Sequence, residues 1–284
     1  MILFYNTDEL SKHIAFLKGE GKSIGFVPTM GALHIGHTSL IEKAKQLNQI
    51  IVCSIYINPL QFNNTNDFEK YPRLIEEDIR ILKDISCDIV YIPDDSIINE
   101  SEHFDYHIGY LDKVMEGYYR PNHFIGVAYI VKKLFEIVKP DNAYFGEKDY
   151  QQLAVVREMT KYFNLNVQII SCPTIREADG LAYSSRNARL TQEERKTAPQ
   201  IFEALQYIKN NISKYSIKDL KLWFKQFLEK GSKMKVEYIE ICDADSMKIL
   251  DNISESSSVV VCTAVFLGNV RLIDNIKIFS NFVA

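Results

Sequence analysis

The stretch that decides the fold is Ser23–Ile57, which reads SIGFVPTMGALHIGHTSLIEKAKQLNQIIVCSIYI. It predicts a strand over Ser23–Pro28, a helix over Thr38–Leu47 and a second strand over Ile50–Ile57. The second strand is apolar at almost every position, which is typical of a sheet covered on both faces. A strand, a helix and a strand in this order predict two parallel strands joined by a crossover.

The same alternation continues as far as Ser171. The pattern predicts helices over Leu74–Ile85, Ile125–Val138 and Tyr150–Phe163, and strands over Ile89–Ile92, Asn142–Phe145 and Val167–Ser171. Repeated strand–helix units predict an α/β fold, and we expect a Rossmann-like parallel sheet in an N-terminal domain of residues 1–175.

After Pro173 the pattern changes to helices followed by strands. Thr191–Glu194 is typical of a capping box, and Pro199 is expected to kink that helix or begin a second one. A further helix is predicted over Ser216–Lys230, and strands over Val236–Cys242, Val259–Leu267 and Arg271–Ile273, with a turn at Gly268-Asn269. We therefore expect a smaller α+β domain over residues 176–284.

Composition excludes several classes of protein. The chain has 284 residues, of which 46% are hydrophobic, and 33 Lys and Arg against 37 Asp and Glu give a net charge of −4. An acidic chain is a poor candidate for nucleic-acid binding, and the longest apolar run, Val259–Leu267, is too short to cross a membrane. The N-terminus lacks the pattern of a signal peptide, and the five cysteines have no CxxC spacing. We expect a cytoplasmic protein with reduced cysteines and neither nucleic-acid nor membrane partners.

The run Pro28–His37, PTMGALHIGH, carries the strongest chemical signal. It follows a predicted strand and opens a helix, where free N–H groups and the helix dipole favour phosphate. Glycines 31 and 36 would allow a close backbone approach, and His34 and His37 could reach one triphosphate. A zinc pair lacks a third ligand at recognisable spacing, and packing alone does not account for two glycines beside two histidines. The sequence therefore predicts a phosphate site at this turn.

Two further segments follow predicted strands. Gln61 offers an uncharged donor and acceptor that suit a hydroxy acid, although a loop glutamine facing water is an equal alternative. In Tyr144–Gln152, Lys148 could neutralise phosphate oxygens, and Asp149 could bind ribose or cap the helix that contains Gln152.

Two loops have weaker signals. Arg176–Asn187 contains two adjacent serines followed by Arg186, which could form a mobile phosphate clamp or a surface loop with a helix cap. Arg120 and His123 could contact an anion, and solvated loop residues are an equal alternative.

Taken together, these segments resemble the pantothenate synthetase family. His34–His37 spells HIGH, a motif that class I aminoacyl-tRNA synthetases and cytidylyl- or adenylyltransferases share. The longer string Pro28–His37 is more specific to this family, as are Asn58–Phe62, Phe145–Gln152 and Ser184–Asn187 in that order. The resemblance covers about residues 20 to 195, and the rest matches only in length and general pattern.

The resemblance implies a Rossmann-like catalytic domain that binds ATP and pantoate, a C-terminal lid domain and a homodimer. It implies ATP- and Mg²⁺-dependent condensation of (R)-pantoate with β-alanine, through a pantoyl adenylate, to pantothenate, AMP and pyrophosphate. This reaction serves the synthesis of vitamin B5 and coenzyme A.

The resemblance also implies roles for individual residues. His37, His34 and Lys148 would be catalytic, with His37 as the usual proton donor. Gln61 would contact pantoate and β-alanine, and Gln152 would hold pantoate. The implied ATP-binding residues are Met30, Gly31, Ala32, Leu33, His34, Ile35, Gly36, His37, Gly146, Glu147, Lys148, Asp149, Ile175, Tyr183, Ser184, Ser185 and Arg186. The metal ligands stay unassigned, although Glu77 and Asp78 lie where some members hold Mg²⁺.

The chain departs from the family pattern at a few positions. Tyr183 replaces Leu or Met, Asn122 replaces Gly, Leu74 replaces Thr, and Asn63-Asn64 replaces Gly-Pro. None of these changes removes a group that the chemistry needs. The alternatives are a transferase that moves AMP or CMP to a phosphorylated acceptor, a tRNA synthetase, which the acidic charge disfavours, and a nucleotide-binding scaffold without activity.

Overall fold

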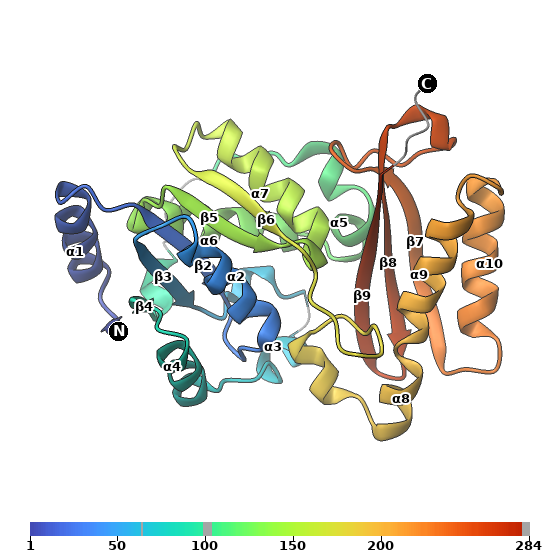
Figure 1. The fold of residues 1–284 in the computed structure, drawn as a ribbon, viewed down its shortest axis with the longest axis horizontal. Helices are drawn as coiled ribbons and strands as arrows, with labels where there is room; N and C mark the ends of the chain where they lie inside the picture. The colour runs from blue at the N-terminus through green and yellow to red at the C-terminus, as the bar shows by residue number, and fades with distance from the viewer. Residues whose placement is uncertain (64, 99–103, 280–284) are drawn as a thin grey trace. The chain divides into compact units, whose positions relative to one another are not determined.

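The computed structural model describes residues 1–63, 65–98 and 104–279. The chain divides into two compact units. Unit 1 comprises Met1–Glu147 and Val155–Pro173, and unit 2 comprises Lys148–Ala154 and Thr174–Ala284 (Figure 1). The first residues of one helix therefore group with the C-terminal part of the chain, and each unit is described separately.

Unit 1 is built on a six-stranded sheet in the order β1-β4-β3-β2-β5-β6, in which every recorded pair of neighbours is parallel. The strands are β1 (Ile2–Phe4), β2 (Ile24–Thr29), β3 (Ile50–Ile55), β4 (Ile89–Tyr91), β5 (Asn142–Gly146) and β6 (Gln168–Cys172). The predicted Rossmann-like parallel sheet is confirmed.

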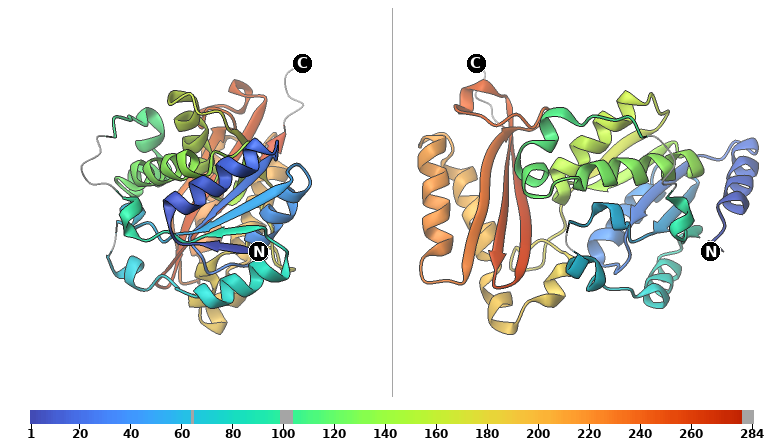
Figure 2. Two further views of the ribbon diagram at one scale, coloured as in Figure 1. Left: turned by 90° about the vertical axis from the view of Figure 1, so that its left-hand side faces the viewer. Right: turned by 180° about the vertical axis from the view of Figure 1, so that it is seen from behind.

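Helices cover both faces of this sheet, as Figure 2 shows from two sides. They are α1 (Thr7–Gly19), α2 (Ile35–Lys45), α3 (Thr65–Glu69), α4 (Ile75–Asp84), α5 (Met115–Tyr119), α6 (His123–Val138) and α7 (Tyr150–Tyr162), the last of which begins in unit 2. Four short 3-10 helices are η1 (Pro59–Gln61), η2 (Asp95–Ile97), η3 (Gly109–Asp112) and η4 (Glu147–Asp149).

The core of unit 1 follows the alternation of side chains along its strands. Val27 and Cys53 belong to the same buried cluster as Ile41 of α2 and Leu82 of α4. The neighbouring Phe26 points to the opposite face, where its ring lies 6.2 Å from that of Phe135 in α6. Burial on both faces explains why these strands are apolar at almost every position.

Unit 2 carries three antiparallel strands, β7 (Met234–Asp243), β8 (Ser258–Leu267) and β9 (Val270–Phe279), in that order. Its helices are α8 (Gln192–Thr197), α9 (Gln200–Asn211) and α10 (Ile217–Glu229), with 3-10 helices η5 (Ser185–Arg189) and η6 (Ile253–Glu255). The fully buried Phe224 and Ile208 join the strand residue Val261 in one apolar cluster. The predicted α+β arrangement is confirmed, including the capping box at Thr191 and the new helix after Pro199.

Three local differences have physical causes. Helix α2 begins at Ile35, before the predicted Thr38, because His34 caps it. Strand β9 is longer than the predicted Arg271–Ile273, because the polar Asp274 and Asn275 interrupt its apolar pattern while lying buried within it. β1, α3 and α5 were not predicted, because elements of three to five residues are too short to show a period. α1 was not predicted either.

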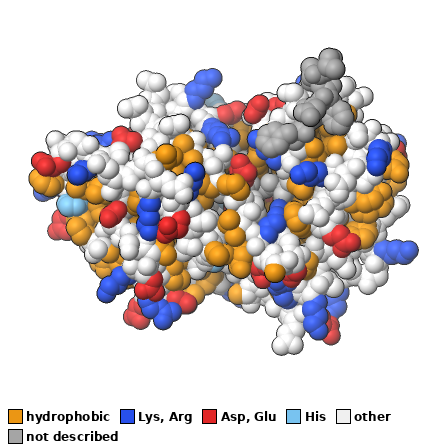
Figure 3. All heavy atoms as spheres, in the orientation of Figure 1, with side chains coloured by type: hydrophobic (Ala, Val, Ile, Leu, Met, Phe, Trp, Pro, Cys, Tyr) orange, Lys and Arg blue, Asp and Glu red, His pale blue; other side chains and the backbone are white. Residues whose placement is uncertain are grey.

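The remaining composition-based expectations concern cysteines and charge. All five cysteines lie within the described residues and are buried thiols. None of the helices in the described part of the chain has the length and apolar character that crossing a bilayer requires. Figure 3 shows Lys and Arg side chains interspersed with Asp and Glu on the face that it draws.

Candidate functional site

The turn after β2 lies at the point where the winding of the sheet reverses. β2 has β3 on one side and β5 on the other, so the chain runs outward from β2 in one direction and from β5 in the other. β2 and β5 are parallel, so their last residues, Thr29 and Gly146, lie at the same edge of the sheet. Ligands of open parallel sheets bind at this edge, beside such a reversal.

The two histidines of this turn cap α2 reciprocally. Nδ1 of His34 accepts a hydrogen bond from the amide of Gly36 at 3.1 Å, and Nδ1 of His37 accepts one from the amide of His34 at 3.3 Å. Their ring centroids are 4.1 Å apart. Because Nδ1 is an acceptor in both rings, the proton of each neutral imidazole is on Nε2. The capping box therefore sets the tautomer that the pair offers to a ligand.

Neighbouring side chains hold most of the backbone amides of the turn. Amides of Gly31, Ala32, Leu33, His34 and Gly36 each donate to an oxygen or nitrogen of a neighbouring side chain. The expectation that this N-terminus presents free N–H groups therefore holds only in part. Side chains of the turn and of α4 hold these five amides, whereas the amide of Ile35, the first residue of α2, makes no hydrogen bond with a described residue. The Nε2–H groups of the two imidazoles are further donors on this turn.

Asp78 of α4 holds the turn through two hydrogen bonds from its backbone. Its carboxylate accepts from the amide of Ala32 at 2.9 Å and from that of Leu33 at 2.7 Å, and the residue is only 1% exposed. Burial raises the pKa of Asp78 above its ordinary value, although the hydrogen bonds from these two amides oppose the rise.

These contacts make Asp78 unsuitable as a ligand of Mg²⁺. Both of its carboxylate oxygens already accept amides, and the neighbouring Glu77 is exposed. No group of three His, Cys, Asp or Glu side chains that could hold a metal ion occurs among the described residues.

Gln61 ends η1, which follows β3, and its amide is oriented by neighbours. Nδ2 of Asn58 donates to Oε1 of Gln61 at 3.2 Å, and Nε2 of Gln61 lies 2.6 Å from Sδ of Met30. The structure therefore brings Gln61 together with the turn after β2. Since Gln61 is only 8% exposed, the alternative of a loop glutamine facing water is wrong.

His123 and Arg120 support Gln61 through its backbone. Nδ1 of His123 lies 2.7 Å from the carbonyl oxygen of Gln61, and Nη2 of Arg120 donates to the same oxygen at 3.4 Å. Arg120 also lies 3.5 Å from the carboxylate of Glu116. His123 is buried, so it is not a solvated loop residue, and both side chains position the loop that carries Gln61. The His-Phe pair that opens α6 gave no sequence signal for this role.

Gly126 permits α6 to touch η1. A Cβ atom at this position would lie 2.4 Å from the carbonyl oxygen of Leu60, a backbone atom that cannot rotate away. We expect Gly126→Ala to displace η1 and to lower the free energy of unfolding by about 1–3 kcal/mol. If Gln61 binds a substrate, as predicted, the KM for that substrate should rise. Urea unfolding and steady-state kinetics measure the two effects.

Gly19 is the matched control for this substitution. It ends α1, and a Cβ atom there would have no neighbour within 4 Å. Because alanine is the better helix former, we expect Gly19→Ala to leave stability equal or higher and KM unchanged. If Gly126→Ala and Gly19→Ala had the same KM and the same free energy of unfolding, the role assigned to Gly126 would be wrong.

The predicted residues after β5 divide between the units. Gly146 and Glu147 belong to unit 1, whereas Lys148, Asp149 and Gln152 belong to unit 2. Nζ of Lys148 lies 3.8 Å from Oδ1 of Asp149. The carbonyl of Lys148 accepts a hydrogen bond from Asn275 of β9 at 2.9 Å, which fixes the backbone of the lysine on unit 2.

The loop of residues 176–187 brings together its own predicted site residues. The amide of Tyr183 donates to the carbonyl of Ile175 at 3.1 Å. Ser184 caps η5, and its hydroxyl oxygen accepts from the amide of Arg186 at 3.3 Å. The helix cap is therefore real, and the same hydroxyl keeps its proton available for donation.

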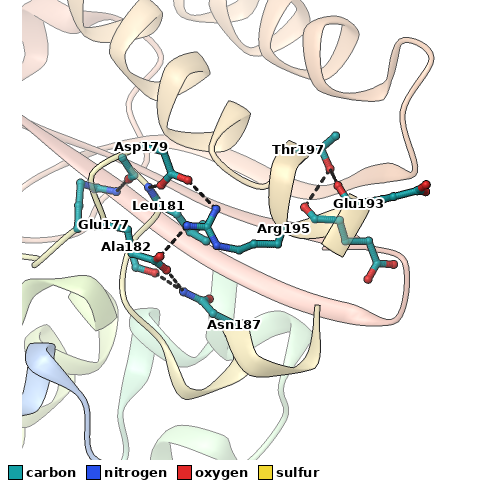
Figure 4. A network of polar contacts seen from close by, with 11 residues as sticks. Glu177, Asp179, Leu181, Ala182, Asn187, Glu193, Arg195 and Thr197 are labelled. Atoms are coloured by element: carbon teal, nitrogen blue, oxygen red, sulfur yellow. Dashed lines mark hydrogen bonds and ion pairs between the residues drawn. The ribbon is translucent and has the colours of Figure 1, made fainter. Parts of the chain in front are cut away.

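Two arginines tie this loop to the rest of unit 2. Arg195 of α8 contacts Glu177 and Asp179 at 2.6 Å each, as Figure 4 shows. Arg176 holds Asp274 of β9 through two hydrogen bonds of 2.7 and 2.9 Å. These ties fix the first part of the loop on unit 2, and the mobile phosphate clamp of Ser184, Ser185 and Arg186 stays a prediction. The sequence pattern did not indicate that Arg195 of α8 takes part in these contacts.

The departures from the family pattern have partial structural explanations. Asn122 adopts a left-handed conformation with φ 66°, which glycine and asparagine tolerate better than other residues. Leu74 is the N-cap of α4 without a side-chain hydrogen bond. Asn64 lies outside the described residues.

The fold defines a Rossmann-like α/β protein, and the turn after its strand β2 carries the sequence His-Ile-Gly-His. The sequence profile of the family described as pantoate–beta-alanine ligase matches residues 2–277. The chain is 43% identical over 281 residues to a pantothenate synthetase of Cytophaga hutchinsonii, with 98% of this chain and 99% of the relative covered. A pantothenate synthetase of Porphyromonas gingivalis is 44% identical over 278 residues, with the same coverage.

Solved structures agree with these relatives. A pantothenate synthetase from Thermus thermophilus superposes with a TM-score of 0.91 at 35% identity, covering 99% of this chain and 100% of that one. A pantoate–beta-alanine ligase from Francisella tularensis, solved with a β,γ-ATP and β-alanine, gives a TM-score of 0.77 at 36% identity and covers 97% of each chain. The chain belongs to the pantoate–beta-alanine ligase family.

Proposed function

We propose that this enzyme condenses (R)-pantoate with β-alanine at the expense of ATP, forming pantothenate, AMP and pyrophosphate through a pantoyl adenylate. Membership of the family supports a ligase that forms pantothenate. The observation that carries the site assignment is the contact of Gln61 with Met30, which joins an uncharged substrate-binding amide to the histidine turn.

The reaction needs two displacements, because a free carboxylate is a poor acyl donor. A pantoate carboxylate oxygen attacks the α-phosphorus of ATP, and the bond from that phosphorus to the pyrophosphate oxygen breaks. The amine of β-alanine then attacks the acyl carbon, AMP leaves with the former carboxylate oxygen, and the nitrogen loses a proton. Such transfer depends on positioning and on charge stabilisation more than on a covalent protein group.

The residues of the chain supply donors and cations for this chemistry. The Nε2–H groups of His34 and His37 would donate to phosphate oxygens at the edge of the sheet. Lys148, the two serines of residues 184–185, and Arg186 would neutralise the remaining oxygens from unit 2. The ATP-binding set further comprises Met30–Leu33, Ile35, Gly36, Gly146, Glu147, Asp149, Ile175 and Tyr183.

Gln61 and Gln152 suit the acid substrate because they are neutral. A cation would pair with the pantoate carboxylate and weaken its attack, whereas an amide holds hydroxyl and carboxylate groups by hydrogen bonds alone. The Asn58–Gln61 contact fixes which end of the Gln61 amide donates. Gln61 would contact both pantoate and β-alanine, and Gln152 would hold pantoate.

The remaining parts of the proposal concern assembly and conditions. Unit 2 would act as a lid that excludes water from the adenylate, and the enzyme would work as a cytoplasmic homodimer in the supply of coenzyme A. Mg²⁺ would enter as the complex with the substrate ATP, since Asp78 does not fit a resident site. The domain boundary near Ile175 stays a prediction.

Isotope exchange between pyrophosphate and ATP tests the proposed function. With Mg²⁺ and (R)-pantoate but no β-alanine, we expect exchange that disappears when (S)-pantoate replaces the (R) enantiomer. Pantothenate formed without this exchange would contradict a freely reversible adenylate half-reaction. The nucleotidyltransferase alternative would be favoured if neither exchange nor pantothenate formation were detected, or if a dinucleotide-like product formed in place of AMP.

A further inference from the structure

We propose that Asp78 is a positioning residue that holds the nucleotide-binding turn in its active shape and is not a ligand of Mg²⁺. The inference rests on the proposed function, in which the turn Met30–His37 binds ATP. It reassigns an acidic residue that lies, by resemblance, where some family members hold the metal ion.

The contact between Asp78 and the turn uses both oxygens of the carboxylate. Oδ2 accepts from the amide of Ala32 and Oδ1 from the amide of Leu33, the next residue along the chain. A carboxylate offers an acceptor at both oxygens, whereas a carboxamide replaces one of these acceptors with a donor. The two bonds connect α4 to the turn across more than forty residues of sequence.

The conformation of the turn shows what this contact accomplishes. Gly31 has φ +78° and Ala32 has φ +49°, and the latter is unfavourable for a residue with a Cβ atom. A Cβ atom on Gly31 would lie 2.8 Å from Oδ2 of Asp78, so glycine is also required for the carboxylate to approach. The hydrogen bonds of Asp78 offset the cost of the left-handed Ala32 and thereby fix where the chain enters α2.

The position of the two histidines depends on where, and in which direction, the chain enters α2. His34 follows Leu33 directly, and its cap on α2 requires an extended backbone with φ −142° and ψ 177°. If Ala32 relaxed to negative φ, the chain would meet α2 at another angle and the reciprocal contact of His34 with His37 would be lost. Asp78 therefore acts on ATP through the histidines, and it contacts no substrate itself.

Burial argues against a metal role for the same residue. Asp78 is 1% exposed, whereas a Mg²⁺ ion keeps several water ligands and needs an accessible carboxylate. The adjacent Glu77 is exposed, and successive residues of a helix point in directions about 100° apart, so the two carboxylates do not converge.

Three variants test this assignment with ATP affinity, measured by equilibrium dialysis, as the main readout. We expect Asp78→Asn to weaken ATP binding by about 10- to 100-fold, since one hydrogen bond to a charged group is lost and a donor faces an amide. We expect Asp78→Glu to weaken it as well, because the longer side chain cannot place both oxygens on adjacent amides. Asp84→Asn, an exposed acid at the end of α4, is the matched control and should bind ATP like the parent enzyme.

A second substitution separates positioning from general stability. Ala32→Gly removes the penalty for the left-handed conformation, so we expect it to restore most of the ATP affinity when it is combined with Asp78→Asn. Circular dichroism melting reports whether each variant folds, and the Asp78→Glu variant keeps the charge if Asp78→Asn does not fold.

The outcomes distinguish the competing roles. A metal ligand would tolerate Asp78→Glu, and excess Mg²⁺ would restore the activity of Asp78→Asn, so either result would overturn the proposal. A lower melting temperature with unchanged ATP affinity would also overturn it. Because dialysis measures binding without turnover, failure of the pyrophosphate exchange in the parent enzyme would count against the proposed function and leave the test of Asp78 intact.

Discussion

We expect His37→Ala to lower kcat/KM for ATP by about 10²- to 10³-fold, the cost of removing one donor aimed at developing charge. The Nδ1 atom of His37 holds the amide of His34, which leaves Nε2 as the nitrogen that carries the proton. Alanine removes both the phosphate donor and the cap on α2. The measurement is the steady-state rate of AMP release with pantoate and β-alanine saturating.

The His37→Gln variant separates these two losses. Glutamine is a common third residue of a capping box, so it should preserve the bond to the amide of His34 and the melting temperature of the enzyme. It lacks the imidazole donor, and we therefore expect it to be nearly as inactive as His37→Ala. Full activity in His37→Gln would show that His37 acts only as a cap, and the catalytic assignment would then be wrong.

Lys148→Ala should produce a loss of similar size, about 10²- to 10³-fold in kcat. Lys148 lies two residues after the end of β5. The hydrogen bond from Asn275 fixes its backbone on unit 2, which limits the positions that its ammonium group can reach. Removing the charge leaves the developing negative charge of pyrophosphate less stabilised in the transition state. The rate of pyrophosphate–ATP exchange with (R)-pantoate measures this step without the amine.

Two comparisons test whether the effect of Lys148→Ala is specific. Lys161→Ala removes an exposed lysine from α7 and should leave the exchange rate unchanged. Lys148→Arg keeps the charge but changes its shape and reach, so we expect it to restore only part of the rate. Equal exchange rates in Lys148→Ala and Lys161→Ala would remove Lys148 from the mechanism.

The sequence predicted the fold well because its signals are local. The period of apolar residues predicted the strands β2 to β6 and the helices α2, α4, α6 and α7, and the apolar strands indicated a sheet buried on both faces. It did not predict the five-residue helices α3 and α5. It failed where a polar residue interrupts a strand, as at Asp274 and Asn275 in β9. There a partner distant in sequence, Arg176, satisfies the buried carboxylate.

The sequence predicted which residues belong to the candidate site but not the hydrogen bonds that connect them. Gln61 and the two histidines were identified from their place after strands, because the ends of parallel strands share one edge of the sheet. The supports of Gln61, which are Asn58 and the buried His123, have no comparable signal. Their roles arise from the packing of α6 against η1 at Gly126, and no periodicity encodes that approach.

The sequence by itself determined the strand–helix order, the family resemblance and the candidate residues, since these depend on neighbours along the chain. Only the tertiary structure decided which amides of the turn are held within the protein. A side chain accepts from the amide of Gly36 at the start of α2, and Asp78, a candidate for metal by resemblance, accepts from those of Ala32 and Leu33 in the turn before it. Hydrogen bonds between segments far apart in sequence form only when packing brings a donor and an acceptor together, and for that reason they could not be read from local patterns.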